Sequence, residues 1–236
     1  MAKHGKKYLN AAKLLEGKTV FTLDEAIALL KKTSTTKFDS SCELHVRLGV
    51  DPTHAEQMVR STVALPHGTG KEVRVIAFVA EDKVKEAKAA GAIKAGMEEL
   101  IDDILKGWLE FDVAVATPDA MKSLGKIAKI LGTKGMMPNP KAGTVTLEVS
   151  KTIGEIKKGK VEFRTDKQSQ MHQIFGKTSF AENALKDNFI ALIKAIVDTK
   201  PAGIKGTYIK NIGVATSMGP GMKLEMSTVM DALKKA

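Results

Sequence analysis

The chain has 236 residues, of which 43% are hydrophobic and 27% are charged, with a net charge of +10 and a single cysteine. This composition is typical of a folded protein with one large or two small domains, and it excludes intrinsic disorder and a disulfide scaffold. The longest apolar run, Val75 to Ala80, is far shorter than the ~20 residues of a membrane span, so we expect no membrane partner. The basic excess favours a polyanionic partner, with nucleic acid as the first choice.

The first third of the chain predicts a helix followed by a half-buried strand. Thr22 and Glu25 have the Ser/Thr-x-x-Glu spacing of a capping box, which marks a helix start. From Leu44 to Val50, apolar residues alternate with polar ones such as His45, as in a strand with one buried face. Cys42 and His45 lack a second pair of ligands, so we expect no metal site and interpret Cys42 as a packing residue.

The middle of the chain has a different pattern. Val73 to Ala80 and Val113 to Ala116 are nearly continuous apolar runs, which are typical of strands covered on both faces. We expect helices after these strands, at residues 82–90, 97–106 and 119–131. This alternation of strands and helices predicts a small α/β layer domain.

The last third resembles the first in its pattern. Ser179 and Glu182 repeat the capping-box spacing, and the apolar stripe from Leu185 to Val197 predicts the helix behind them. Val161 and Phe163 alternate with polar residues, as do the apolar positions from Met222 to Met226. Because both outer segments contain half-buried strands, we expect them to form one discontinuous α+β domain.

The charge is concentrated in these outer segments. Residues 1–67 carry 10 basic and 7 acidic side chains (+3), residues 68–159 carry 15 and 13 (+2), and residues 160–236 carry 12 and 7 (+5). The outer segments therefore hold +8 of the total, and we expect their domain to supply most of the attraction for a polyanion.

Enzymatic motifs were tested as an alternative. The GKT sequences at Gly17 and Gly176 lack the upstream glycine of a phosphate-binding loop, and Gly68 to Lys71 precedes a strand instead of following one. We interpret the latter segment as a hinge or domain junction. We therefore expect no enzyme and no cofactor. A nucleotide-dependent α/β enzyme and a general basic RNA chaperone stay as the alternative functions.

Short polar stretches in the outer segments have the chemistry of an RNA contact. Thr216 to Gly221 combines hydroxyl groups with Gly219, which lets the backbone approach a ligand, and Met218, which can lie against a ribose or base. Phe38 is an aromatic residue in a polar stretch and can stack on an unpaired base, although it equally fits a core position. A third group of side chains surrounds an expected hairpin loop: Arg164, Asp166, Lys167, His172 and Lys177.

Several longer motifs carry a resemblance to a known family. They are Thr36–Phe38, LGVDP at Leu48–Pro52, LPHGTGK at Leu65–Lys71, LGTKGMMPNPK at Leu131–Lys141, EFRTDK at Glu162–Lys167 and TSMGPG at Thr216–Gly221. With these motifs the chain resembles, essentially from end to end, the bacterial ribosomal protein L1 family of the large-subunit side stalk. It departs from the usual pattern at Thr36 (commonly alanine), Met136 (frequently leucine) and Ser217 (commonly threonine).

The resemblance implies an α+β domain with a split β-α-β arrangement from residues 1–66 and 160–236, and an inserted Rossmann-like three-layer α/β domain from residues 67–159. It implies a structural protein of the large subunit, cytoplasmic and without obligate homo-oligomers. The protein would bind large-subunit rRNA, form the mobile stalk that accompanies deacylated tRNA from the exit site, and repress translation of its own mRNA. The residues that match the family's rRNA contacts are Lys37, Phe38, Ser41, Glu43, Arg164, Lys167, His172, Ser217, Met218 and Gly219.

Overall fold

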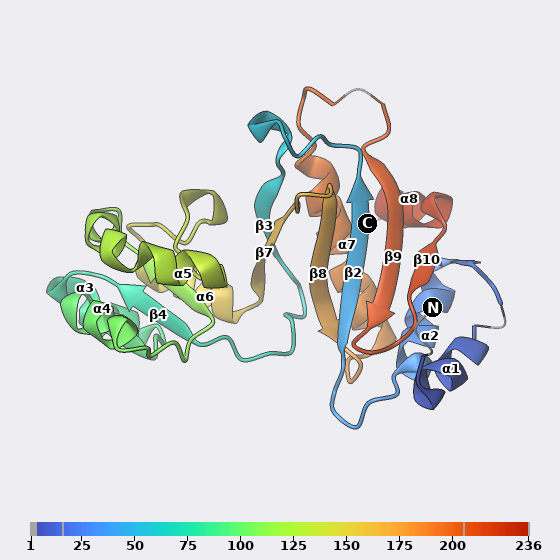
Figure 1. The fold of residues 1–236 in the computed structure, drawn as a ribbon, viewed down its shortest axis with the longest axis horizontal. Helices are drawn as coiled ribbons and strands as arrows, with labels where there is room; N and C mark the ends of the chain where they lie inside the picture. Colours follow the sequence, from blue (N-terminus) through green and yellow to red (C-terminus); the bar gives the residue numbers. More distant parts are fainter. Residues whose placement is uncertain (1–3, 16, 205, 236) are drawn as a thin grey trace. The chain divides into compact units, whose positions relative to one another are not determined.

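The computed structural model describes residues 4–15, 17–204 and 206–235 (Figure 1). The chain divides into two compact units, and each has its own hydrophobic core. Unit 1 consists of Met1–Gly70 and Val161–Ala236, and unit 2 consists of Lys71–Lys160. The first boundary between the units lies within the glycine-rich Gly68–Lys71 segment.

Unit 1 contains a five-stranded sheet, a two-stranded sheet and the helices that cover the larger sheet. Its elements are α1 (Lys6–Lys13), β1 (Val20–Phe21), α2 (Leu23–Thr33), β2 (Ser41–Leu48), η1 (Ala55–Gln57), β3 (Arg60–Ala64), β7 (Lys160–Arg164), β8 (Gln170–Lys177), α7 (Glu182–Asp198), β9 (Ile209–Thr216), β10 (Met222–Leu224) and α8 (Met226–Lys235). The five-stranded sheet has the order β1-β10-β9-β2-β8, and β3 pairs with β7 in the smaller sheet.

Strand β2 comes from the first part of the chain but lies between two strands from the last part. It pairs antiparallel with β8 on one side and with β9 on the other. Strands β8 and β9 therefore run in the same direction, and α7 connects them while β2 lies between them (Figure 1). This split β-α-β topology brings residues from both ends of the sequence onto one surface.

One face of the sheet is covered by helices because the apolar residues of each element lie on one side. On β2 the residues Cys42, Leu44, Val46 and Leu48 are buried, and they pack in one cluster with the apolar stripes of α2 and α7. The predicted capping box of α2 is confirmed: Thr22 Oγ1 accepts from the Glu25 backbone N–H, and the Glu25 carboxylate accepts from that of Thr22.

Two local predictions in unit 1 are wrong. The N-cap residue of α7 is Ala181, whose methyl group cannot accept a capping hydrogen bond, and the Ser179 hydroxyl donates to Asp39. Strand β10 ends at Leu224, and Met226 begins α8, so the alternation from Met222 to Met226 crosses a strand boundary.

Unit 2 is a three-stranded parallel sheet with helices on both faces. Its elements are β4 (Val75–Phe78), α3 (Glu81–Ala89), β5 (Lys94–Gly96), α4 (Glu98–Leu105), β6 (Val113–Ala116), η2 (Asp119–Ile127), α5 (Ala128–Lys134), η3 (Pro140–Ala142) and α6 (Val149–Lys157). The strand order is β5-β4-β6. Each residue of β4 is buried, as the continuous apolar run predicted.

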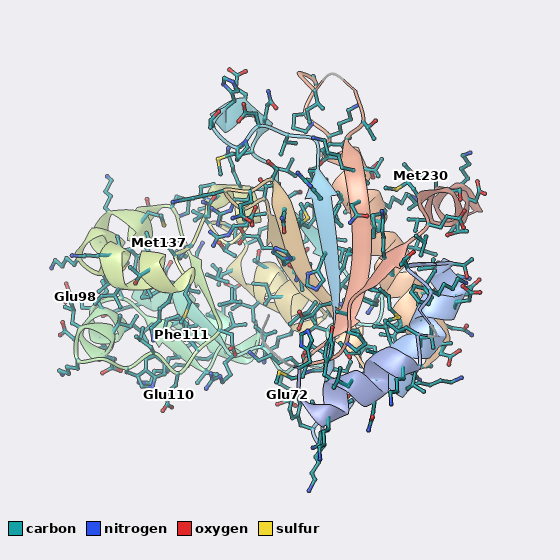
Figure 2. All side chains as sticks on the ribbon, turned by 45° about the vertical axis from the view of Figure 1, so that its right-hand side comes forward. Glu72, Glu98, Glu110, Phe111, Met137 and Met230 are labelled. Carbon is teal, nitrogen blue, oxygen red and sulfur yellow. The ribbon has the colours of Figure 1, made fainter. Side chains whose placement is uncertain are left out.

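Alternate residues of β4 serve two separate cores. Ile76 and Phe78 pack on one face with α4 and η2, together with Phe111 and the partly buried Met137 (Figure 2). On the other face, Val75 and Ala77 pack with α3 and α6. The helix expected at 119–131 is a 3₁₀ segment, η2, followed by the short helix α5, which continues to Lys134.

Across the part of the chain that the structure describes, none of the helices combines the length and apolar character needed to cross a bilayer.

Candidate nucleic-acid interface

The five-stranded sheet of unit 1 has a second face that the helices do not cover. The alternation along β2 that buries its apolar residues places Ser41, Glu43, His45 and Arg47 on this open face. The register brings His172 of β8 beside His45. The open face is therefore polar, with side chains from segments more than 100 residues apart.

A series of polar contacts runs across this face. The Ser217 hydroxyl donates to Glu43 Oε1 over 3.3 Å, and Glu43 Oε2 lies 3.8 Å from His45 Nε2. His45 Nδ1 lies 2.8 Å from His172 Nδ1, and His172 Nε2 lies 3.9 Å from Asp166 Oδ2. Three predicted contact residues, Ser217, Glu43 and His172, are thus connected by this series of contacts. His45 lies between Glu43 and His172 in the series.

Seven predicted residues lie at the end of the sheet where β2 begins and β9 ends (Figure 1). We call them the loop-end cluster: Lys37, Phe38, Ser41, Glu43, Ser217, Met218 and Gly219. The backbone N–H of Ser217 donates to the Ser41 carbonyl over 3.0 Å, which fixes the β9–β10 loop against the start of β2.

Phe38 is 62% exposed on a loop that is held in place on both sides. The Asp39 carboxylate accepts from the Thr178 hydroxyl and from both the backbone N–H and hydroxyl of Ser179. The Ser179 side-chain hydrogen bond is the main reason that the pKa of Asp39 is lowered from its ordinary value. An aromatic ring presented to solvent by an anchored loop can stack on a base without first ordering that loop. The alternative of a core position for Phe38 is excluded by its exposure.

Met218 is 76% exposed and adopts a φ of 67°, a left-handed conformation that non-glycine residues rarely adopt. The chain thus projects an apolar side chain into solvent from a strained turn. The structure gives a further reason for a glycine at position 219. A Cβ atom there would overlap the buried hydroxyl of Thr216. The absence of a side chain at Gly219 accommodates the Thr216 hydroxyl, and its expected role in letting a ligand approach stays a prediction.

The remaining three predicted residues lie elsewhere on unit 1. Arg164 ends β7, Lys167 lies in the loop between β7 and β8, and His172 is on β8. All three are exposed, and all three line one hollow. Lys177, expected beside them, is at the opposite end of β8, where its Nζ donates to Ser41 Oγ over 2.9 Å. Lys177 is the last residue of β8, five positions after His172, so the length of the strand separates it from Arg164 and Lys167.

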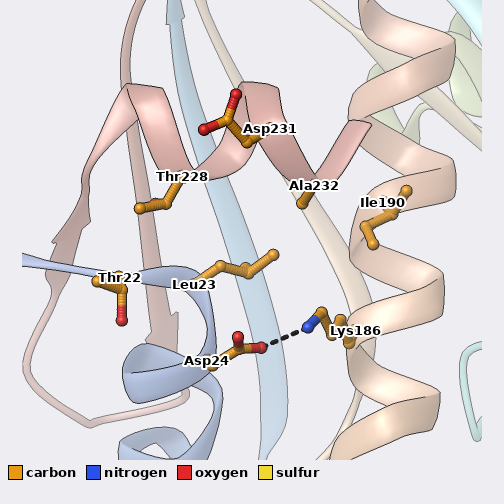
Figure 3. Close-up of a pocket in the computed structure, with 8 residues that line it drawn as sticks. All are labelled: Thr22, Leu23, Asp24, Lys186, Ile190, Thr228, Asp231 and Ala232. Carbon is orange, nitrogen blue, oxygen red and sulfur yellow. Dashed lines mark hydrogen bonds and ion pairs between the residues drawn. The ribbon is translucent and has the colours of Figure 1, made fainter. Parts of the chain in front are cut away.

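Two hollows of unit 1 differ in charge. The hollow in Figure 3 is lined by Asp24, Asp231 and Lys186, and Lys186 Nζ already pairs with Asp24 Oδ1 at 2.6 Å. The other hollow, next to the β7–β8 loop, is lined by the basic side chains of Arg60, Arg164 and Lys167 and by one carboxylate, Asp166. A phosphate group would be repelled by the first and attracted by the second.

The described residues include no group of three or more His, Cys, Asp or Glu side chains that could hold a metal ion. Cys42 is buried in the core below the sheet, and burial raises the pKa of its thiol to about 12. The thiol therefore stays protonated and unreactive at neutral pH, in keeping with a packing residue.

Sequence reasoning missed His45 and Asp39 as parts of this surface. The signal for His45 was available, because alternation places it on the same face as Glu43. The role of Asp39 had no local signal, since its partners Thr178 and Ser179 are about 140 positions away.

A comparison with protein families identifies a matching family. The model described as the ribosomal protein L1p/L10e family matches residues 30–220, which is more than three quarters of the chain. The matched range contains all ten predicted contact residues. Helices α1 and α8 lie outside it.

Proposed function

Because the chain belongs to the ribosomal protein L1p/L10e family, a family of structural ribosomal proteins that bind rRNA and not of enzymes, we propose that the open face and loop-end cluster of unit 1 are its rRNA-binding surface. Family membership places the protein in the ribosome, in the cytoplasm. We further propose that this surface binds the rRNA of a large subunit of the bacterial type, which the sequence motifs support.

One observation carries the proposal. Glu43 and Ser217 are 174 positions apart in the sequence, yet their side chains are joined by a hydrogen bond on a surface that no helix of unit 1 covers. Around them, Phe38 and Met218 expose apolar side chains at the same end of the sheet. Hydroxyl, carboxylate and exposed apolar groups together match the ribose hydroxyls and base faces of folded RNA.

The electrostatics of unit 1 are consistent with this role. Its sequence has 21 basic and 14 acidic side chains (+7), against 16 and 13 (+3) in unit 2. Basic side chains supply affinity for any RNA by neutralising phosphates, whereas the uncharged groups of the loop-end cluster select among RNA shapes.

The experiment is filter binding of the full chain to fragments that together cover large-subunit rRNA, with an unrelated structured RNA and ATP as competitors. We expect one fragment to bind at least about 1,000-fold more tightly than the unrelated RNA, within the usual range of specific over non-specific recognition. Equal binding of every fragment would favour the general RNA chaperone instead. Saturable ATP binding would favour the nucleotide-dependent enzyme.

We extend the proposal to three finer roles that the family resemblance implies. In the ribosome the protein would form the mobile side stalk and accompany deacylated tRNA as it leaves the exit site. Outside the ribosome, the same surface would bind a similar fold in its own mRNA and repress translation. A reporter carrying the 5′ region of that mRNA tests repression, which should disappear when the preferred rRNA fragment is added as a competitor.

A further inference from the structure

The hollow beside the β7–β8 loop contains two side chains, Met58 and Arg60, that no sequence motif singled out. It has a volume of about 490 Å³ and lies wholly within unit 1. Besides Arg164, Lys167 and His172, it is lined by Pro52 and Met58 from the segment between β2 and β3, and by Arg60, the first residue of β3. This combination of apolar and basic groups is absent from the hollow of Figure 3, whose charged lining residues are two aspartates and one lysine.

The floor of the hollow is buried and hydrogen-bonded. Val59 and Thr165 are nearly inaccessible, with 3% and 4% exposure. The backbone N–H of Thr165 donates to the Val59 carbonyl over 3.0 Å, and its hydroxyl donates to the same oxygen over 3.3 Å. These bonds join the two walls, so the hollow is formed before any ligand arrives.

One wall presents an apolar surface to solvent. Met58 is 52% exposed, although it is next to the buried Val59, and Pro52 also lines the hollow. A methionine side chain is polarizable and adapts its shape to a flat partner, so it packs well against an aromatic ring.

The rim presents positive charge. Arg60 pairs with Glu162, but Arg164 and Lys167 form no ion pair with any residue that the structure describes. The acidic residue that lines the hollow, Asp166, accepts hydrogen bonds through Oδ1 from the backbone N–H groups of Gln168 and Gln170. Two cations are thus available for a phosphate next to an apolar wall.

We propose that this hollow binds a single unpaired nucleotide of the RNA, with its base against Met58 and Pro52 and its phosphates at Arg164 and Lys167. The inference rests on the proposed function and adds to it the kind of RNA element recognised. The volume lies within the range of ligand pockets, and bases displaced from a helix are the usual target of sequence-specific RNA recognition. His172 lines the hollow and contacts His45, so this site continues the open face.

The test follows the methionine methyl resonances of the full chain by NMR, labelled with ¹³C at the methyl carbon. Met58→Ala assigns the Met58 signal, and Met230 on α8 provides a distant exposed methionine (Figure 2). Adenosine monophosphate, uridine monophosphate and inorganic phosphate are titrated in separate samples.

We expect both nucleotides to shift the Met58 signal saturably with half-saturation in the millimolar range, which is typical of a single stacked base with one phosphate. Inorganic phosphate should leave the Met58 signal in place, and Met230 should not respond to any ligand. Arg164→Ala should raise the half-saturation concentration by about fivefold or more, through loss of a charge-assisted contact.

Two results would overturn the proposal: a Met58 signal that ignores both nucleotides, or one that responds equally to inorganic phosphate. Half-saturation by either nucleotide below about 10 μM would also contradict it. Such a binding free energy exceeds what one base and one phosphate supply, and would indicate a site for a free metabolite instead of RNA.

The complex with the preferred rRNA fragment separates the two proposals. If the fragment binds tightly but leaves the Met58 signal unchanged, the nucleotide site is wrong while the proposed function stands. If the nucleotides shift Met58 but none of the rRNA fragments binds selectively, the proposed function is wrong, and with it the assignment of this hollow to RNA.

Discussion

His45 Nδ1 and His172 Nδ1 lie 2.8 Å apart on the open face of the unit 1 sheet, although the residues are 127 positions apart in the sequence. A hydrogen bond between two Nδ1 atoms needs one proton, and each Nε2 faces a carboxylate at about 3.8 to 3.9 Å. A carboxylate favours a proton on the nitrogen that faces it. Burial on the sheet and the neighbouring His172 both disfavour the charged form of His45.

This relationship predicts a pH dependence of stability. Burial first, and the neighbouring His172 second, lower the pKa of His45 below its ordinary value. Unfolded His45 takes up a proton near pH 6.5, whereas the folded residue does so only at lower pH. The stabilisation is thus present above pH 6.5 and is lost as the pH falls. We expect thermal unfolding midpoints to decrease from pH 7.5 to 5, and His45→Gln to reduce that decrease.

The effect of His45 should be below about 1 kcal/mol, since the side chain is 36% exposed and solvent screens its interactions. His54→Gln is the matched control, because that ring is 67% exposed on a loop. Equal pH profiles for the wild type and His45→Gln would show that the histidine pair does not contribute.

Phe38→Ala should weaken binding of the preferred rRNA fragment by roughly 10- to 100-fold, because one base–aromatic stack contributes about 1–3 kcal/mol. The unfolding midpoint should hardly change, since the ring is 62% exposed. Phe38→Trp should keep most of the affinity. Leu147→Ala removes an equally exposed apolar side chain (65%) in unit 2 and serves as the control in the same filter-binding assay.

Met218→Gly should separate stability from recognition. The left-handed φ of 67° costs a methionine roughly 1–2 kcal/mol, which glycine avoids, although glycine loses about 0.5–1 kcal/mol through its freer unfolded chain. Urea unfolding should therefore show equal or slightly higher stability for the variant. Its specific rRNA affinity should fall while its affinity for unrelated RNA is kept. A parallel loss of both affinities would mean that Met218 has no part in selecting the RNA.

Gly219→Ala should destabilise unit 1 by about 1–3 kcal/mol, as overpacking does, because the new methyl group meets the Thr216 hydroxyl. That hydroxyl is buried and has no hydrogen-bond partner in the described structure, so Thr216→Ala alone should cost little. The double variant should recover most of the lost stability. Urea denaturation of all four proteins measures the coupling, and simple additivity would contradict the proposed contact.

Unit 1 should fold and bind RNA by itself when Met1–Gly70 is joined through a short linker to Val161–Ala236. Circular dichroism during heating checks for a cooperative transition, and filter binding compares its affinity with that of the full chain. If about 4 to 6 phosphates are neutralised, log K should fall with log salt at a slope of roughly −3 to −5. Tighter rRNA binding by unit 2 alone would contradict the placement of the interface.

The sequence by itself was sufficient for the elements whose signals are local. The capping box at Thr22 and Glu25 predicted the start of α2, and alternation along β2 predicted which side chains face away from the core. The continuous apolar run at β4 predicted a strand buried on both faces. These predictions succeed because side-chain periodicity and capping depend on residues within a few positions of each other.

The contact residues came from a family resemblance, and they stay predictions until RNA binding is measured. What the tertiary structure decided is how they are grouped. Placing β2 between β8 and β9 brings Glu43 to Ser217 and His45 to His172, and the length of β8 separates Lys177 from Arg164. The tertiary structure also places Ser179 next to Asp39, so its hydroxyl donates to that carboxylate and does not cap α7. Periodicity carries no information about which strands pair or in which register, because these depend on packing between segments more than 100 residues apart.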